Sequence, residues 1–129
     1  MSITRINSLG ITDGTIVNGD INASAAIAST KLTGVNDAKA WINFNGTGTP
    51  AIRASFNVTS ITDIGTGKYE VNFTTALTDA NYSVVVGTNA GQSYIFADST
   101  GTSSLIRIAT ADSSGSVVDT NFICVAVFR

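Results

Sequence analysis

The chain has 129 residues and a formal net charge of −2; 43% of its residues are hydrophobic and only 12% are charged. This length suits one domain with its own core, and the low charge content predicts an ordered chain. We expect neither nucleic acid nor a membrane as a partner, because the chain has no basic stripe and no apolar run that approaches about 18 residues.

The first 37 residues repeat an aliphatic side chain at an unusual spacing. The spacing is five residues, with one slip of a single residue, and the series is Ile6, Ile11, Ile16, Ile21, Ile27 and Leu32. Helices repeat every 3.6 residues and strands every 2 residues, so neither explains the series. A short repeat with one aliphatic residue cannot bury that residue by itself. We therefore predict that residues 1–37 form an extended arm for docking and trimerisation.

Three arrangements would bury this aliphatic row. They are a short β-helical coil within the chain, three copies around a common axis, and an arm laid along another protein. The segment is too short and too irregular for a pentapeptide coil, so the last two fit better. A helix over residues 23–31, with Asn22 as its N-cap and Gly34 beyond its end, is a further expectation.

Residues 38–129 read as short strands separated by Gly, Asn, Asp and Ser, which is typical of an antiparallel β-sandwich head. We expect about seven strands, over residues 39–44, 54–63, 68–74, 82–87, 93–97, 105–110 and 117–129. A change of parity at Ile61 predicts a bulge, and Gly65-Thr66-Gly67 predicts a hairpin turn. The expected core is Ile42, Phe44, Phe56, Val58, Tyr69, Val71, Phe73, Val84, Val86, Ile106, Ile108, Phe122 and Phe128.

The last strand is apolar on both faces, whereas a half-buried strand alternates with polar residues. Phe122, Cys124, Ala126 and Phe128 lie on one face, and the other face holds Ile123, Val125 and Val127. We assign Phe122 and Phe128 to the core. Ile123, Val125 and Val127 are then predicted to meet a neighbouring subunit. The alternative is a central strand that is covered on both faces within one chain.

Two aromatic residues are candidates for surface contacts. Trp41 points away from Ala40, Ile42 and Phe44, and it follows the arm directly. An outward tryptophan either fills a subunit interface or stacks on a sugar ring, and we favour the interface. Tyr94, beside the turn at Gly91, is the candidate for a glycan contact.

The side chains of common catalytic and metal sites are scarce. The chain has no histidine, and Cys124 is its single cysteine. Most aspartates stand beside residues that favour turns, which explains them without a catalytic role. We therefore expect no enzyme activity, no cofactor and no metal. A glycan-cleaving enzyme that uses two carboxylates is the competing hypothesis from another class.

Three stretches resemble the head region of tail-fibre-like virion proteins of tailed phages, especially phages of marine bacteria. They are KAWINFNGTGT at 39–49, IRASFNVTSITD at 52–63 and GTGKYEVNFT at 65–74. The arm motifs ITDGTI at 11–16 and DINASAAIA at 20–28 look like the stalks that precede such heads. The resemblance implies a trimeric, non-enzymatic virion component with no catalytic motif to carry over.

Two functions fit these expectations. The first is a short trimeric fibre or spike whose head is displayed on the virion surface and contacts host surface glycans. The second is a capsid decoration protein whose arm binds the shell, which the brevity of the 37-residue arm favours over a long fibre. The N-terminal residues lack the apolar core of a signal peptide, so we expect synthesis in the host cytoplasm.

Overall fold

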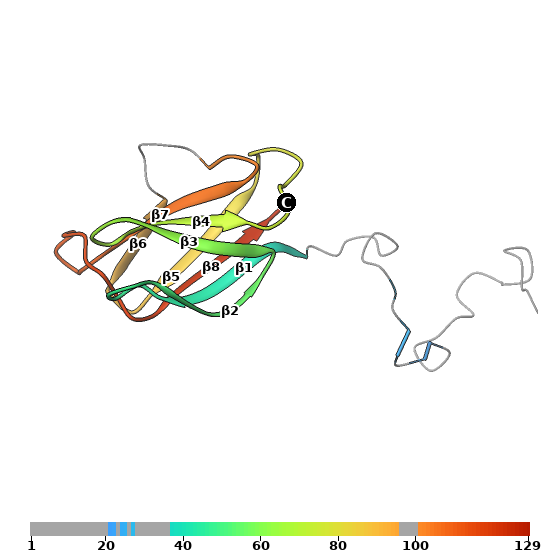
Figure 1. Cartoon of the computed structure of the whole chain (residues 1–129), viewed down its shortest axis with the longest axis horizontal. Helices are drawn as coiled ribbons and strands as arrows, with labels where there is room; N and C mark the ends of the chain where they lie inside the picture. The colour runs from blue at the N-terminus through green and yellow to red at the C-terminus, as the bar shows by residue number, and fades with distance from the viewer. Residues whose placement is uncertain (1–20, 23, 26, 28–36, 96–100) are drawn as a thin grey trace, which may run out of the picture. The chain divides into compact units, whose positions relative to one another are not determined.

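The computed structural model describes residues 21, 22, 24, 25, 27, 37–95 and 101–129 (Figure 1). The chain divides into two units, Met1–Val35 and Asn36–Arg129. The second unit, called the head below, is all-β, and none of the described residues belongs to a helix.

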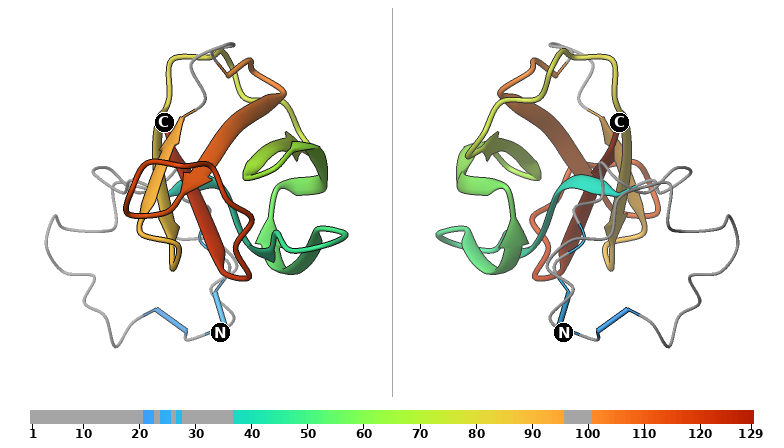
Figure 2. Two further views of the ribbon diagram at one scale, coloured as in Figure 1. Left: turned by 90° about the vertical axis from the view of Figure 1, so that its left-hand side faces the viewer. Right: turned by 90° about the vertical axis from the view of Figure 1, so that its right-hand side faces the viewer.

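The head has two four-stranded sheets in which each pair of neighbouring strands is antiparallel. Sheet A has the order β2-β1-β8-β5 and sheet B has the order β3-β4-β7-β6. The strands are β1 (Ala38–Asn45), β2 (Ala51–Phe56), β3 (Val58–Gly65), β4 (Lys68–Phe73), β5 (Ser83–Thr88), β6 (Gln92–Ile95), β7 (Leu105–Ala111) and β8 (Ile123–Phe128). In the views along the strands, β5 and the β3–β4 hairpin lie on opposite sides of the head (Figure 2). The prediction of an antiparallel all-β head is confirmed.

The predicted strand at 54–63 is two strands in different sheets, which raises the number from about seven to eight. β2 ends at Phe56 in sheet A, and β3 begins at Val58 in sheet B. Asn57 between them has a φ of 54°, a left-handed conformation that asparagine tolerates better than most residues. The expected change of parity has its counterpart in a register shift between Val58 and Ser60 against β4.

The predicted hairpin at Gly65–Gly67 is confirmed, since β3 pairs with β4 and Gly65 lies opposite Lys68. Gly67 has a φ of 65°, and a Cβ atom there would lie 2.7 Å from the Thr110 carbonyl oxygen. Only glycine meets both conditions. The last strand is shorter than predicted, because β8 begins at Ile123 and Val117 makes only an isolated bridge with Ala111.

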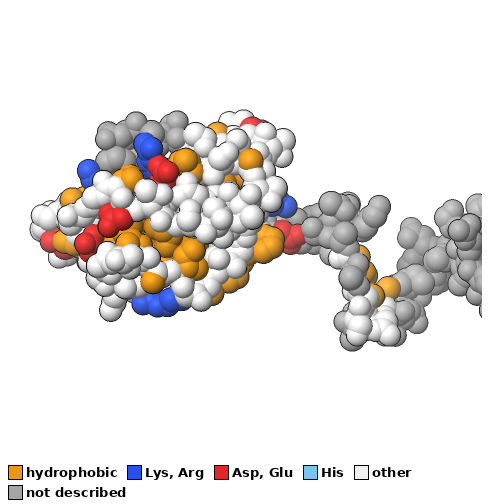
Figure 3. All heavy atoms as spheres, viewed as in Figure 1, with side chains coloured by type: hydrophobic (Ala, Val, Ile, Leu, Met, Phe, Trp, Pro, Cys, Tyr) orange, Lys and Arg blue, Asp and Glu red, His pale blue; other side chains and the backbone are white. Residues whose placement is uncertain are grey.

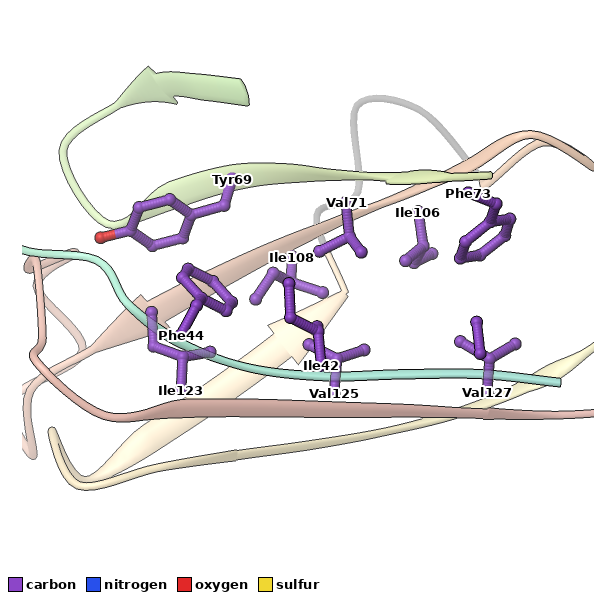
Figure 4. Close-up of a cluster of buried hydrophobic side chains, with 11 residues drawn as sticks. Ile42, Phe44, Tyr69, Val71, Phe73, Ile106, Ile108, Ile123, Val125 and Val127 are labelled. Carbon is purple, nitrogen blue, oxygen red and sulfur yellow. The ribbon is translucent and has the colours of Figure 1, made fainter. Parts of the chain in front are cut away.

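The core lies between the two sheets, where side chains from β1, β4, β7 and β8 converge (Figure 4). Phe44 and Tyr69 meet edge to face, with ring centroids 5.2 Å apart and planes at 78°. Each large aliphatic or aromatic side chain buried in this way stabilises the fold by about 1.5–3 kcal/mol. The fully buried hydrophobic cluster is Ala40, Ile42, Phe44, Tyr69, Val71, Phe73, Ile106, Ile108, Ile123, Val125 and Val127.

Three predicted core residues lie elsewhere. Phe56 is 55% exposed and Phe122 is 47% exposed. Phe128 is half-buried, and it alternates along β8 with the buried Val127. Phe56 faces outward because it pairs with the outward Trp41, and directly opposed residues share a face of the sheet.

The assignment of Ile123, Val125 and Val127 to a subunit interface is wrong. These side chains are 0–2% exposed and form one side of the core. Phe44 lies opposite Ile123 and Ile42 lies opposite Val125, so pairing with β1 fixes the phase of β8. The outward face of β8 carries Cys124, Ala126 and Phe128 instead.

A buried polar network fastens the loops at the end of the head that contains the β3–β4 turn. The Tyr69 hydroxyl lies 3.0 Å from both the Gly46 carbonyl oxygen and Asp119 Oδ1. Asp119 Oδ1 also accepts a 2.6 Å hydrogen bond from the Gly67 amide. Burial, followed by the Asp119 carboxylate, raises the pKa of Tyr69 above its ordinary value, so the phenol stays protonated.

Candidate interaction surface

The outward face of sheet A carries an apolar row that crosses all four strands. Trp41 in β1 lies opposite Phe56 in β2 and Ala126 in β8, and Ala126 lies opposite Val85 in β5. Opposed residues in antiparallel strands share a face, so these four side chains stand side by side. We call this surface the Trp41 face.

The members of the row are well exposed for apolar side chains. Trp41 is 40% exposed, Phe56 is 55% exposed and Val85 is 61% exposed. The flanking outward positions that the strand register pairs directly are uncharged: Ala38, Asn43, Asn45, Ala51, Ala54, Ser83, Gly87, Cys124 and Phe128. The charged residues Lys39 and Arg53 lie at the register shifts of β1 and β2. Contiguous apolar surface of this kind marks an interaction site more often than a solvated face.

The polar groups near the centre of this face are partly engaged within the chain. The Asn43 side-chain amide donates a 3.0 Å hydrogen bond to the Cys124 sulfur, across the β1–β8 pair. Ala126, which lies between Trp41 and Val85, and its outward neighbour Cys124 are both small. A sheet face with few polar groups suits contact with another protein surface better than capture of a small molecule.

The outward face of sheet B is different in chemistry. Glu70 in β4 and Arg107 in β7 are opposed and form an ion pair of 2.8 Å. Asn72 donates a 3.1 Å hydrogen bond to the Thr62 hydroxyl across the β3–β4 pair. Cross-strand pairs of this type are usual on a solvated sheet face.

Tyr94, the predicted glycan contact, belongs to the face of sheet B. It lies opposite Ala109 in β7 and is 39% exposed. Trp41 and Tyr94 are thus equally exposed aromatic residues on opposite outer faces of the head.

The aliphatic arm is represented by few described residues. Ile21 is 40% exposed and Ile27 is 47% exposed. The predicted contact residues Ile6, Ile11, Ile16 and Leu32 lie outside the described residues, as does most of the predicted helix at 23–31. Asn22 accepts a 2.8 Å hydrogen bond from the Ser24 amide through its side chain, and another from the Ala25 amide through its carbonyl.

Two further areas of the head were not predicted as surface features. Apolar side chains gather between β2 and β3 in Figure 3, and Ile52 and Ile64 of these strands are 40% and 38% exposed. All six residues of the edge strand β2 are exposed. Phe56 and Val85 were also missed, because the Trp41 face is assembled from four strands and only their register brings its members together.

The exposed carboxylates with shifted pKa values hold turns. Hydrogen bonds from Ser114 and Ser116 lower the pKa of Asp112, and the Asn81 amide lowers the pKa of Asp79. Within 37–95, 101–129 and the few described arm positions, no three His, Cys, Asp or Glu side chains are grouped to hold a metal ion. The same residues include no helix long and apolar enough to cross a membrane.

Comparison with known proteins adds no relative: no family model, no curated protein and no solved structure matches the chain.

Proposed function

We propose that the protein is a non-enzymatic virion structural protein, a short trimeric fibre or spike with its β-sandwich head displayed on the virion surface. The observation that carries the proposal is the uncharged Trp41 face, opposed to a polar face on the other sheet. The resemblance of residues 39–74 to tail-fibre-like phage proteins supplies the virion context.

The proposed trimer places three Trp41 faces around a threefold axis, so that each face touches both neighbours. Four strands spaced about 4.8 Å apart, each presenting about six residues at 3.4 Å, give a face on the order of 400 Å². Stable interfaces bury about 800 Å² per partner, so the face supplies roughly half of the area needed. The aliphatic row from Ile6 to Leu32 is proposed to supply the remainder.

The absence of charge at the paired positions of the Trp41 face suits contact between identical copies. A charged residue near a symmetry axis would meet its own copies, and such like-charge contacts cost free energy unless a counter-charge is present. The named positions of the face avoid this cost. The exposed edge strand β2 would also be covered, which removes a site for uncontrolled strand pairing.

Host attachment is proposed to use the opposite side of the head. Tyr94 on the face of sheet B would stack against a sugar ring, as aromatic side chains with one polar end commonly do. Three such sites in a trimer would gain in avidity even if each site were weak.

A capsid decoration protein is the second candidate, favoured by the short arm. Antibody labelling of intact virions separates the two candidates, because a fibre labels the tail or a vertex and a decoration protein labels the shell lattice. Absence of the chain from purified virions would refute both candidates. Depolymerisation of host polysaccharide by the purified chain would establish the enzyme hypothesis instead.

A further inference from the structure

A pocket of about 240 Å³ lies at the end of the head where β1 begins. Four segments that are distant in sequence line it. They are the start of β1 with Lys39, Asn57 between β2 and β3, the loop after β4 with Thr75, Leu77 and Thr78, and the chain beyond β8 with Arg129. Pockets for drug-sized ligands usually measure about 300–1,000 Å³, so this volume suits a smaller ligand.

Asn57 joins two of the other segments, the start of β1 and the loop after β4. Its side-chain amide donates hydrogen bonds of 3.0 Å and 3.1 Å to the carbonyl oxygens of Lys39 and Thr75. Its side-chain oxygen accepts a 2.8 Å hydrogen bond from the Thr75 amide. Asn57 therefore has two roles. Its left-handed backbone lets the chain pass from sheet A to sheet B, and its side-chain hydrogen bonds fix the part of the pocket wall formed by Lys39 and Thr75 before any ligand binds.

Two cationic side chains line the pocket, in a head with few cations. Residues 37–129 contain Lys39, Arg53, Lys68, Arg107 and Arg129 as their cationic side chains, and two of these five line the pocket. Arg129 pairs with Asp79, which also accepts a 2.7 Å hydrogen bond from the Asn81 amide. Lys39 has no acidic partner among the described residues. Arg129 is thus paired through its side chain and also carries the α-carboxylate of the chain, so Lys39 is the cation of the pocket that is left to meet an anion.

We propose that this pocket binds a small ligand with one carboxylate and several hydroxyl groups, the chemistry of an acidic sugar such as a hexuronic acid. Lys39 would attract the carboxylate, the hydroxyls of Thr75 and Thr78 would meet sugar hydroxyls, and Leu77 would contact the ring. The inference rests on the proposed function only in treating the ligand as part of a host surface glycan, and it adds a site distinct from Tyr94.

The test is a titration of the full-length chain with glucuronate, followed by amide chemical shifts, with glucose as the neutral control. Glucuronate is expected to bind about tenfold more tightly than glucose, because of its charge-assisted hydrogen bond to Lys39; tenfold corresponds to about 1.4 kcal/mol. Shifts should centre on Asn57 and residues 75–78, and affinity should fall at high salt. Equal affinity for the two sugars, or shifts centred elsewhere, overturns the proposal.

The matched variants are Lys39→Gln and Lys68→Gln, which remove the same charge at the two ends of the head. Lys39→Gln should lose the preference for glucuronate, and Lys68→Gln should keep it, with both variants melting as cooperatively as the unmodified chain. Equal effects of the two variants would show that binding depends on overall charge and would refute the site. The ligand proposal and the proposed virion function can fail separately. A trimer that is found in virions but does not bind glucuronate refutes only the ligand proposal. A monomer that is absent from virions but binds glucuronate refutes only the proposed virion function.

Discussion

The two outer faces of the head are built from the same kind of strand and carry opposite chemistry. On sheet B, cross-strand pairs such as Glu70 with Arg107 neutralise charge in place. On sheet A, the equivalent positions hold Trp41, Ala126 and Val85, with no charge between them. Water solvates the polar face of sheet B readily, whereas covering the apolar face of sheet A with another surface lowers the free energy. Sheet A is therefore the side on which we place the proposed subunit contact.

The largest loss of stability is expected from a charge placed on the inward side of β8, compared with the same charge on its outward side. Val125→Asp places a carboxylate in a site that is 2% exposed, and the surrounding hydrophobic cluster contains no cationic side chain. The cost should exceed about 4 kcal/mol, against a total stability of about 5–15 kcal/mol for a domain. Thermal melting followed by circular dichroism should show the cooperative transition lost or lowered by tens of degrees.

Ala126→Asp is the matched control for that substitution, because it is the next residue and faces outward. Its carboxylate can be solvated in the separate chain, so the head should keep its β spectrum and melt cooperatively. If Ala126→Asp unfolds the head and Val125→Asp does not, the two faces of β8 are assigned the wrong way round.

The second effect concerns assembly and compares the two exposed aromatic residues. Trp41→Glu should convert the proposed trimer of about 40 kDa, three times the 13.3 kDa chain, into monomers. Three carboxylates would gather near the axis in a desolvated contact. Light scattering at micromolar concentration measures the mass.

Tyr94→Glu makes the same charge change on the face of sheet B, at almost the same exposure. It should leave the trimer intact and weaken attachment to host cells. A trimer that survives Trp41→Glu and is lost in Tyr94→Glu would place the subunit contact on sheet B.

The third effect separates the Trp41 face from the arm. A chain that begins at residue 38 retains all eight strands and both outer faces. It should fold cooperatively and associate more weakly, since the face alone offers only about half of a standard interface. Sedimentation over a range of concentrations measures the association. An unfolded product would mean that the arm is part of the core, and incorporation into virions would mean that the docking surface lies on the head.

Sequence patterns were sufficient to predict which side chains are buried in strands whose two sides differ in polarity. Residues 68–74 alternate cleanly, and β4 buries Tyr69, Val71 and Phe73 as expected. Trp41 was likewise placed outward from its neighbours alone. Local alternation fails where both sides are apolar, as in β8, because the choice between Phe122 and Ile123 is made by pairing with β1, some 80 residues earlier.

The alternation of polar and apolar residues could not predict the change of sheet at Asn57 either, but for a different reason. Residues 54–63 read as one strand with a bulge, and a single left-handed residue was enough to divide them. What stabilises that conformation is the set of bonds from Asn57 to Lys39 and Thr75, residues 18 positions away on either side. Only the assembled fold shows those partners, and the pocket follows from them.

The smallest effect is expected from Glu70→Gln on the polar face. The Glu70 and Arg107 side chains are 15% and 35% exposed, so solvent already screens part of their attraction. Exposed and half-exposed ion pairs contribute about 0–1 kcal/mol, and glutamine can still accept a hydrogen bond from Arg107. For a domain of this size, 1 kcal/mol corresponds to a change of about 4–8 °C in Tm, so the melting temperature should fall by less than that. The mass in solution should not change, because a solvated face has no partner to lose. If Glu70→Gln instead dissociates the trimer while the isolated head melts normally, the Glu70–Arg107 pair belongs to a subunit contact. The division of the head into a solvated face and a contact face would then be wrong.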